Sequence, residues 1–487
     1  MADPNASGGP LWWLGKLQVR LANRQTELKR LDAYYSGDHP LPFLTPAHAD
    51  KMRSQFRQLL NESRANFMRL VVDATEERLR VEGFRLSASS DEQADSDTWM
   101  LWQANSMDQE SQTALLESLI KGVSYLSVWS GKKTETASIA VEDPSETIVA
   151  YVPGTNYRQR SAALKIWSDE ETSMLRANVF LPDGIYKYQR KLDIRAVTSY
   201  GQAYADSAIT DRGADWQEIP VEPYVRNPFN VVPIIPLRNR PRLGCEGESE
   251  LSDVIAPQQK INGFLFLLGL AGYFGAHRQR WMTGVKMMTD EASEQEMEPF
   301  DVAIDRLWQS EDPEAKFGEF GQTDLTGYIK SIEQAVLHIA VTTRTPRHYL
   351  IQEGQSPSGD AIASAESGLV KKVERKHRPY GEAFEETLRL ARKFAGMEDA
   401  PPDSEIVWVD PQTLSPAVIT DAVIKQYAGG LIPWAAALEK LGYSPTEIER
   451  FERFRMQDAL LGALSTPGEG LAPDPGPSQV QPPPIEA

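Results

Sequence analysis

The chain has 487 residues, and its 51 Lys and Arg against 69 Asp and Glu give a formal net charge of −18. This length is enough for roughly two to four domains with a sizeable core. The charge argues against a protein that grips nucleic acid through its phosphates, because such proteins are usually basic. It does not exclude a surface past which DNA slides without sticking.

Cysteine, histidine and hydropathy patterns set further limits. The single cysteine, Cys245, permits no internal disulfide or Cys/His metal framework, and we expect a small buried or half-buried residue there. The six histidines show no metal-ligand spacing, so we predict no metal and no cofactor. The N-terminus lacks the pattern of a signal peptide. The most apolar run, Gly263 to Ala276, has fourteen residues. Since a bilayer needs about 20 residues, the run predicts a helix at a core or subunit interface.

The first half of the chain predicts helices followed by a sheet. Apolar residues at helical spacing predict helices over 11–38, 50–80 and 97–121, and "RVEGFRL" between the last two predicts a strand. From Gly122 to about Arg240 the chain has short β-branched and aromatic runs, such as "VSYLSVW" and "ALKIW". The "PDG" at 182–184 indicates a hairpin turn. We therefore expect a mixed or antiparallel sheet.

The second half is again largely helical. Helices are predicted over 249–276 and 323–342, separated by a compact insert with eleven acidic and five basic residues. A polar loop with two glycines follows the second helix. The next long helix is predicted to kink at Pro379 and Gly381. A further helical region covers about 415–464. The last 22 residues hold seven prolines and three glycines and predict a disordered tail.

Motifs of known chemistry are absent from the sequence. There is no phosphate-binding loop, no metalloprotease helix and no nucleophile elbow. The acids of "TDEASEQEMEPFD" suggest either a solvated surface or a carboxylate-dependent nuclease. The basic run "KKVERKHR" (371–378) suggests phosphate contacts or, in the simpler interpretation, a charged helix face or salt bridges at a subunit interface. His338 and the tryptophans at 12–13, 99 and 102 are expected to serve packing.

The order and spacing of several segments resemble a known family. These segments are "YYSGDHPL", "VVDATEERLRVEGFRL", "WQANSMDQESQTALLESLIKGVSYLSVW", "NPFNVVPIIPLRNRPR" and "SPSGDAIASAESGLVKKVERKHRPYGEAFEETLRLARKFA". Together they resemble the portal proteins of tailed bacteriophages, in particular those of long-tailed actinobacteriophages. The resemblance runs from about Trp12 to Leu464, and no single motif carries it. The proline-rich tail departs from the family pattern.

The resemblance implies an α+β fold, mostly helical, with wing, stem, clip and crown parts that assemble as a ring around a channel. Its expected divisions are an N-terminal arm and wing (1–240), a first stem helix (241–276), a clip (277–322), a second stem helix (323–342), a tunnel loop (343–358), a long kinked wing helix (359–397), a helical crown (398–465) and the tail (466–487). It also implies a conduit without bond-making chemistry, so we expect no enzymatic activity.

Two sets of residues become candidates under this resemblance. The tunnel-loop candidates for DNA contact are Arg344, Arg347, His348, Gln352, Gln355 and Ser356. The three basic residues have an equally simple alternative, in which they cap the stem helix and pair with nearby acids. The candidates for a clip docking surface are Asp290, Glu291, Glu294, Glu298, Asp301 and Glu311.

The resemblance further implies partners and a location. The partners are other copies in a ring, expected to be a dodecamer, double-stranded DNA, the large terminase, head–tail connector or adaptor proteins, and the major capsid and scaffolding proteins. The location is the portal vertex of the virion, after assembly in the host cytoplasm, with no membrane partner. The alternatives are another structural virion protein, such as an adaptor or minor capsid protein, a membrane-associated protein, and the carboxylate-dependent nuclease.

Overall fold

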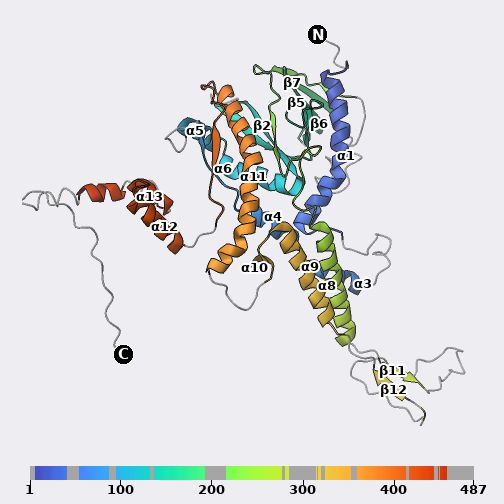
Figure 1. Ribbon diagram of the computed structural model, residues 1–487. Coiled ribbons are helices and arrows are strands. Elements are labelled where there is room, and N and C mark those ends of the chain that lie inside the picture. Colours follow the sequence, from blue (N-terminus) through green and yellow to red (C-terminus); the bar gives the residue numbers. More distant parts are fainter. Residues whose placement is uncertain are drawn as a thin grey trace, which may run out of the picture. The chain divides into compact units, whose positions relative to one another are not determined.

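The computed structural model describes residues 6–40, 54–86, 95–131, 136–169, 171–191, 215–276, 280–283, 314, 316–319, 324–351, 359–412, 416–441, 443, 448 and 450–457. The chain divides into two compact units, Met1–Gln412 and Thr413–Ala487. The first unit combines long helices with several sheets (Figure 1). All strand pairs among the described residues are antiparallel. This confirms the predicted α+β class.

The N-terminal helix α1 (Pro10–Ser36) covers one face of the largest sheet. Its buried stripe of Leu14, Leu17 and Leu21 packs on the apolar side chains of that face. The helix ends at Gly37, whose φ of 89° is the left-handed conformation that glycine adopts freely. The strands of the sheet are, in spatial order, β4 (Thr147–Tyr151), β5 (Arg160–Asp169), β6 (Met174–Leu181), β7 (Gly184–Lys191) and β8 (Gln217–Glu218), and β9 (Tyr224–Arg226) also pairs with β7. The predicted "PDG" turn connects β6 to β7.

A three-stranded sheet packs on the other face of the large sheet. Its spatial order is β10 (Ile234–Arg238), β2 (Val123–Ser130) and β3 (Ala137–Glu142). Strand β2 shows the period-2 alternation of a strand that is buried on both sides. Val123 and Tyr125 join the core between the two sheets, whereas Leu126 and Val128 join the main helical core. The first unit is therefore built as stacked layers.

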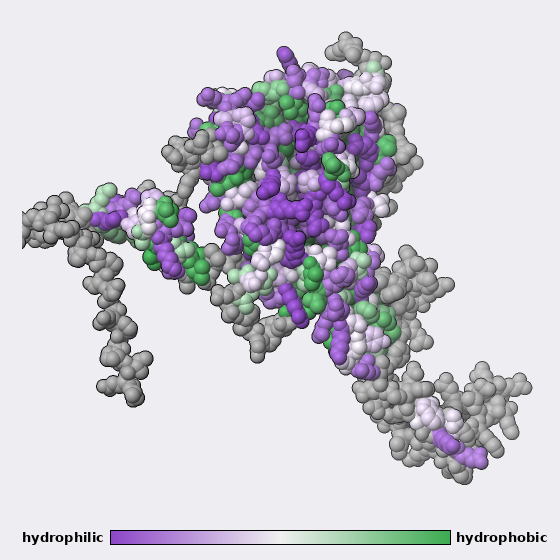
Figure 2. All heavy atoms as spheres, viewed as in Figure 1, coloured by the Kyte–Doolittle hydropathy of each residue, from purple (hydrophilic) through white to green (hydrophobic). Residues whose placement is uncertain are grey.

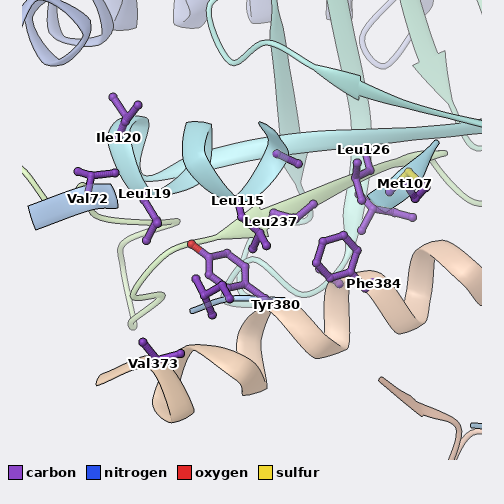
Figure 3. Close-up of a cluster of buried hydrophobic side chains, with 14 of the residues drawn as sticks. Val72, Met107, Leu115, Leu119, Ile120, Leu126, Leu237, Val373, Tyr380 and Phe384 are labelled. Carbon is purple, nitrogen blue, oxygen red and sulfur yellow. The ribbon is translucent and has the colours of Figure 1, made fainter. Parts of the chain in front are cut away.

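The main core lies between the three-stranded sheet and a group of helices. The helices are α4 (Phe67–Glu76), α5 (Ser96–Ala104), α6 (Met107–Lys121) and α11 (Gly359–Phe394). Figure 3 shows Tyr380 and Phe384 of α11 directed toward Leu115 of α6 and Leu237 of β10. The Tyr380 hydroxyl donates a hydrogen bond to Ser118 Oγ at 3.1 Å. Helix α11 continues without interruption through Pro379, where the sequence predicts a kink.

Two helices predicted as continuous are each divided in the structure. The predicted helix over 50–80 is α3 (Ser54–Glu62) followed by α4, and Asn66 caps α4 by accepting from the backbone N–H groups of Met68 and Arg69. The predicted helix over 97–121 divides between α5 and α6 because Ser106 takes a φ of 53°. Asn105 holds this turn by donating to the carbonyls of Leu101 and Ala137.

A small sheet joins the beginning of the first unit to its end. The predicted strand near residue 81 is β1 (Val81–Arg85), and it pairs with β13 (Glu405–Trp408). Trp408 also stacks on the His377 ring of α11, with ring centroids 4.6 Å apart. The expected helical crown over 398–465 therefore begins with a strand at 405–408, since the pairing with β1 and the Trp408 contact hold this segment extended.

The remaining elements belong to the segments predicted as stem, clip, tunnel loop and crown. Helices α8 (Ile255–Ala276) and α9 (Thr326–Thr343) are separated in sequence by a hairpin of β11 (Arg280–Thr283) and β12 (Lys316–Glu319), and the short helix α10 (Arg347–Leu350) follows α9. Pro257 lies in the first turn of α8, where its missing N–H costs no hydrogen bond. The second unit contains α12 (Pro416–Ala428) and α13 (Trp434–Lys440).

Candidate functional site

Helices α8 and α9 form an antiparallel pair that runs side by side (Figure 1). Val336 and Ile339 of α9 are buried with Ile261 of α8 in the main core. Leu265 and Ile332, about one helical turn further from this core, are partly buried against it. The pair is therefore anchored to the main core at one end and held together by an apolar seam.

Buried amides fix the beginning of α8 to the segment between α3 and α4. Gln258 Oε1 accepts from the Phe67 N–H at 2.9 Å, and its Nε2 donates to the Ala65 carbonyl at 2.7 Å. Asn262 Oδ1 accepts from the Ala65 N–H at 3.0 Å. Both amides are almost fully buried. Satisfied buried hydrogen bonds of this kind set one orientation of the helix, because unpaired groups there are costly.

The rest of the pair leaves apolar surface uncovered in the single chain. Leu267 and Tyr273 of α8 are 38% and 45% exposed, and Ile329 of α9 is 46% exposed. The other described apolar residues between 264 and 271 are half-buried. Apolar side chains are interspersed over this region in the surface view (Figure 2). An apolar helix that is covered along one side alone indicates contact with further protein.

None of the helices in the described ranges combines the length and apolarity that a bilayer span requires.

The first part of the predicted tunnel loop is folded. Arg344 ends α9 with a φ of 57°, and its backbone N–H donates to the carbonyls of Ala340 and Val341. Thr345 and Pro346 are buried directly after it. The Thr343 hydroxyl donates to the Ile339 carbonyl at 2.8 Å and lies 2.8 Å from the Thr345 hydroxyl. The backbone of Arg344 thus caps α9, which is one of the two equally simple alternatives expected for this residue, and its side chain takes no part in the cap.

A buried ion pair holds α10 in place. Arg78 donates to the Tyr349 hydroxyl at 2.7 Å and to the Pro411 carbonyl at 2.7 Å. Its guanidinium also lies 3.1 Å from Glu366 Oε2 of α11, and Tyr349 donates to the other oxygen of Glu366 at 2.9 Å. Burial raises the pKa of the Tyr349 hydroxyl, so it stays a donor at neutral pH. His348 Nε2 lies 3.7 Å from Glu366 Oε1.

A second buried charge cluster lies just before α8. Glu250 has a 1% exposed side chain, and its carboxylate lies 2.8 Å from Lys372 Nζ and 2.5 Å from Lys376 Nζ. Arg240 Nε and Asn239 Nδ2 each lie 3.1 Å from Glu250 Oε1. This one carboxylate therefore connects the segment that leads into α8 to the middle of α11.

The charge state of Glu250 follows from its neighbours. Burial alone would raise the pKa of this carboxyl, but the charges of Lys376, Lys372 and Arg240 outweigh burial and hold its pKa well below the usual range. Glu250 is therefore a carboxylate at neutral pH. A buried acid of this kind serves structure here, because the four groups that surround it are cations and an amide.

The structure separates the predicted site residues into two groups. Arg344 lies at the end of α9, and Arg347 and His348 lie on α10. The other tunnel-loop candidates, Gln352, Gln355 and Ser356, and all six clip candidates, Asp290, Glu291, Glu294, Glu298, Asp301 and Glu311, lie outside the described residues.

The structure also shows where three lysines of the basic run and His338 lie. Of the basic run, Lys372 and Lys376 are buried on Glu250, and Lys371 forms the expected helix-face pair with Glu374 at 2.6 Å. His338 is exposed on α9, so the prediction of a packed core histidine is wrong. The reason is that α9 turns Val336 and Ile339 inward.

The predicted packing of Trp13, Trp99 and Trp102 and the predicted burial of Cys245 are confirmed. Trp102 is buried and stacks on Trp99, with ring centroids 5.6 Å apart. Cys245 is half-buried. Within the described ranges, His, Cys, Asp and Glu form no group of three that could hold a metal ion.

Sequence reasoning did not find Glu250, Glu366 or Arg78. Arg78 lies more than 100 residues from Glu366, and Glu250 lies more than 100 residues from Lys372 and Lys376. A single acid in "GESE" or "SAES" resembles any surface acid. The one available indication was the lysine pair 372 and 376, whose i, i+4 spacing places both amines on one helix face.

Comparison with known proteins agrees with these features. A sequence model of the family described as "Phage portal protein, SPP1 Gp6-like" matches residues 15–453. The chain is 30% identical over 451 residues to the portal protein of Mycobacterium phage L5, which covers 88% of this chain and 86% of that protein. It is 29% identical over 427 residues to the portal protein of Mycobacterium phage D29, covering 84% of this chain and 81% of that protein.

The fold, the paired helices and these similarities define a structural component of the phage virion. Specifically, the chain belongs to the phage portal protein family. It functions as a portal, the passage at one capsid vertex through which double-stranded DNA is packaged and ejected. The resemblance to portals of actinobacteriophages is confirmed, because both relatives come from mycobacteriophages.

Proposed function

We propose that about a dozen copies of this chain close into a ring and that α8 and α9 of each copy form the wall of its channel. The observation that carries this proposal is the uncovered apolar surface of the pair, with Leu267, Tyr273 and Ile329 between 38% and 46% exposed in one chain. In a ring, each pair would bury one stripe on its own partner helix and another on the next copy. The hydrophobic effect would then favour closure.

The segments take distinct places in this ring. The layered sheets with α1 and α11 would form the wing, α8 and α9 the stem, and 277–322 the clip. We move the start of the crown from residue 398 to about 413, because β13 and its neighbours belong to the first unit. The crown then comprises the part of the second unit that precedes residue 466, and it holds α12 and α13. The Pro-rich tail 466–487 would follow it.

The proposed partners dock at the ends and rim of the ring. The acidic clip segment, with eleven acidic and five basic residues between 277 and 322, would meet the large terminase during packaging and the head–tail connector proteins afterwards. The major capsid and scaffolding proteins would contact the outer rim. The ring would assemble in the host cytoplasm and remain at the portal vertex of the virion.

The chain would act on DNA mechanically and not as an enzyme. Hydrolysis of ATP would belong to the terminase, in agreement with the missing phosphate-binding loop. A channel in a chain of net charge −18 would mostly repel the duplex. The DNA would therefore slide with few attachment points.

The second half of the tunnel loop supplies the moving contact with DNA in this proposal. Gln352, Gln355 and Ser356 would project toward the duplex from a base that Arg78 and Glu366 hold rigid. Arg344, Arg347 and His348 sit at that base. A polar loop on a fixed base can follow a changing helical surface.

Deletion of residues 352–356 tests this function. The variant should still form the ring but should yield no nuclease-protected DNA in a packaging assay. The matched control deletes five residues, 479–483, from the Pro-rich tail and should package normally. Normal packaging by the loop deletion would contradict the proposed role of the loop.

A further inference from the structure

A basic pocket lies where three segments of the first unit meet. It has a volume of about 560 Å³ and is bounded by the segment after β10, the end of α9 and the middle of α11. Seven of its twelve lining residues are lysine or arginine, and one, Glu248, is acidic. In a chain of net charge −18, this concentration of positive charge is unusual.

The internal ion pairs account for three of the seven cations. Arg240, Lys372 and Lys376 surround the buried Glu250, as described above. The remaining four are the exposed side chains of Arg242, Arg344, Arg375 and Arg378. Across the described ranges, no carboxylate lies within 4.0 Å of any of these four guanidiniums.

The four arginines come from parts of the chain that look unrelated in sequence. Arg242 ends the "NRPR" segment, Arg344 caps α9, and Arg375 and Arg378 belong to the basic run on α11. The i, i+3 spacing of the last two places them on the same helix face. The surface over α11 is strongly hydrophilic (Figure 2). The fold thus joins two weak indications of phosphate contact, Arg344 and "KKVERKHR", in one place.

The chemistry of the cluster favours an anion. Guanidiniums remain charged at any physiological pH, so four of them around one pocket repel each other unless a negative group enters. Their planar donors match the oxygen pairs of phosphate in a bidentate manner. Because the four side chains are exposed, a ligand can reach them from solvent. The duplex that a portal passes carries a phosphate about every 1.7 Å along its axis.

We propose that this basic pocket is a phosphate-binding site, occupied by phosphates of the DNA backbone or by free inorganic phosphate. The DNA source rests on the proposed function, and the free-phosphate source does not. On this account Arg375 and Arg378 supply the principal contacts, because neither pairs with a carboxylate in the described part of the chain and the two share one face of α11.

The test uses the assembled full-length protein and a double variant, Arg375→Gln/Arg378→Gln. The matched control, Lys371→Gln/Lys393→Gln, removes the same charge from the same helix, at lysines that pair with Glu374 and Asp399 away from the pocket. One arm measures binding of a labelled DNA duplex by fluorescence anisotropy over a salt series. The other measures the thermal midpoint against inorganic phosphate at constant ionic strength. The mass of the assembly is recorded for every protein.

Removing the two guanidiniums should make the slope of log K against log salt shallower by roughly one for each DNA phosphate that they neutralise, and the control should keep the wild-type slope. An unchanged DNA slope combined with the disappearance of phosphate-dependent stabilisation would support the site with free phosphate as its source.

If the variant matches the control in both arms, the proposal is wrong. The proposal is also wrong if the double variant keeps the wild-type DNA salt slope and phosphate response but no longer assembles at low salt. In that case the pocket receives an acidic segment of another copy. Normal assembly of a wild-type protein that binds neither the labelled duplex nor inorganic phosphate would overturn the site and leave the proposed ring intact.

Discussion

Glu250 shows how a single residue fixes the beginning of the stem. The Glu250 side chain is 1% exposed, and the amines of Lys372 and Lys376 lie within 2.8 Å of its carboxylate. Replacing it with Gln would keep the shape but leave Lys372 and Lys376 buried without a counter-charge. Breaking a buried ion pair in this way costs about 3–5 kcal/mol. We expect a loss of stability of that order for Glu250→Gln, measured by urea unfolding.

The control for this variant is Glu374→Gln. Glu374 also pairs with a lysine on α11, but Lys371 is exposed, and such surface pairs contribute less than about 1 kcal/mol. Equal losses of stability for the two variants would show that the buried cluster stabilises the fold no more than an exposed ion pair does.

Acid should weaken the same cluster. The pKa of Glu250 in the folded chain lies below its ordinary value of 4.5. A depressed carboxyl pKa stabilises the folded state fully above the unfolded value and progressively less as the pH falls toward the folded value. The stability difference between wild type and Glu250→Gln should therefore be constant near neutrality and shrink below about pH 4.5. A difference that is the same at pH 7 and at pH 3 would contradict this assignment.

Among elements, one close backbone contact locks the segment before α8 against the end of α6. A Cβ added at Gly247 would lie 2.0 Å from the carbonyl oxygen of Gly122. Because backbone cannot move aside cheaply, Gly247→Ala should cost about 1–3 kcal/mol. Thermal unfolding of the wild type and of Gly247→Ala measures this loss of stability. Gly15→Ala is the control, since its added Cβ in α1 would meet nothing within 4 Å beyond the neighbouring backbone of the helix itself, and it should be neutral or slightly stabilising.

The apolar side of α8 gives a prediction about assembly. Leu267 is 38% exposed in the single chain, so Leu267→Asp should change the stability of that chain little but place a charge in the proposed ring contact. We expect the assembly to dissociate to smaller species in light scattering. Val221→Asp is the control, because Val221 is 80% exposed and lies between β8 and β9. Intact rings from Leu267→Asp would contradict the proposed stem contact.

The elements were largely predictable because apolar periodicity is a local property. The leucines of α1, the β-branched runs of the sheets and the steps of three and four in α9 all indicated the right structure. The breaks were not predictable. The turn at Asn105 and Ser106 interrupts a helical pattern through a hydrogen bond to Ala137, 32 residues from Asn105, and β13 depends on its pairing with β1.

The site was predictable at the level of segments but not of contacts. The sequence indicated two long helices, an acidic insert and a polar loop in the right order. It could not show that Tyr349 and Glu366 fold the first part of that loop, because their common partner, Arg78, lies 271 residues from Tyr349. Nor could it show that Arg344 lines the same pocket as Arg375 and Arg378.

For the whole molecule, the central claim is that copies of this chain surround a channel. The single chain supports it through the half-covered α8 and α9 pair, and the family supports it through its function as a portal. Heterologous contacts between identical chains close into a ring when the rotation between neighbours completes a circle.

The most direct test is negative-stain electron microscopy of the purified protein, with the mass of the assembly measured in parallel. We predict top views of a ring with a central hole and a mass of about a dozen chains. A monodisperse monomer or dimer under all solution conditions would contradict the account.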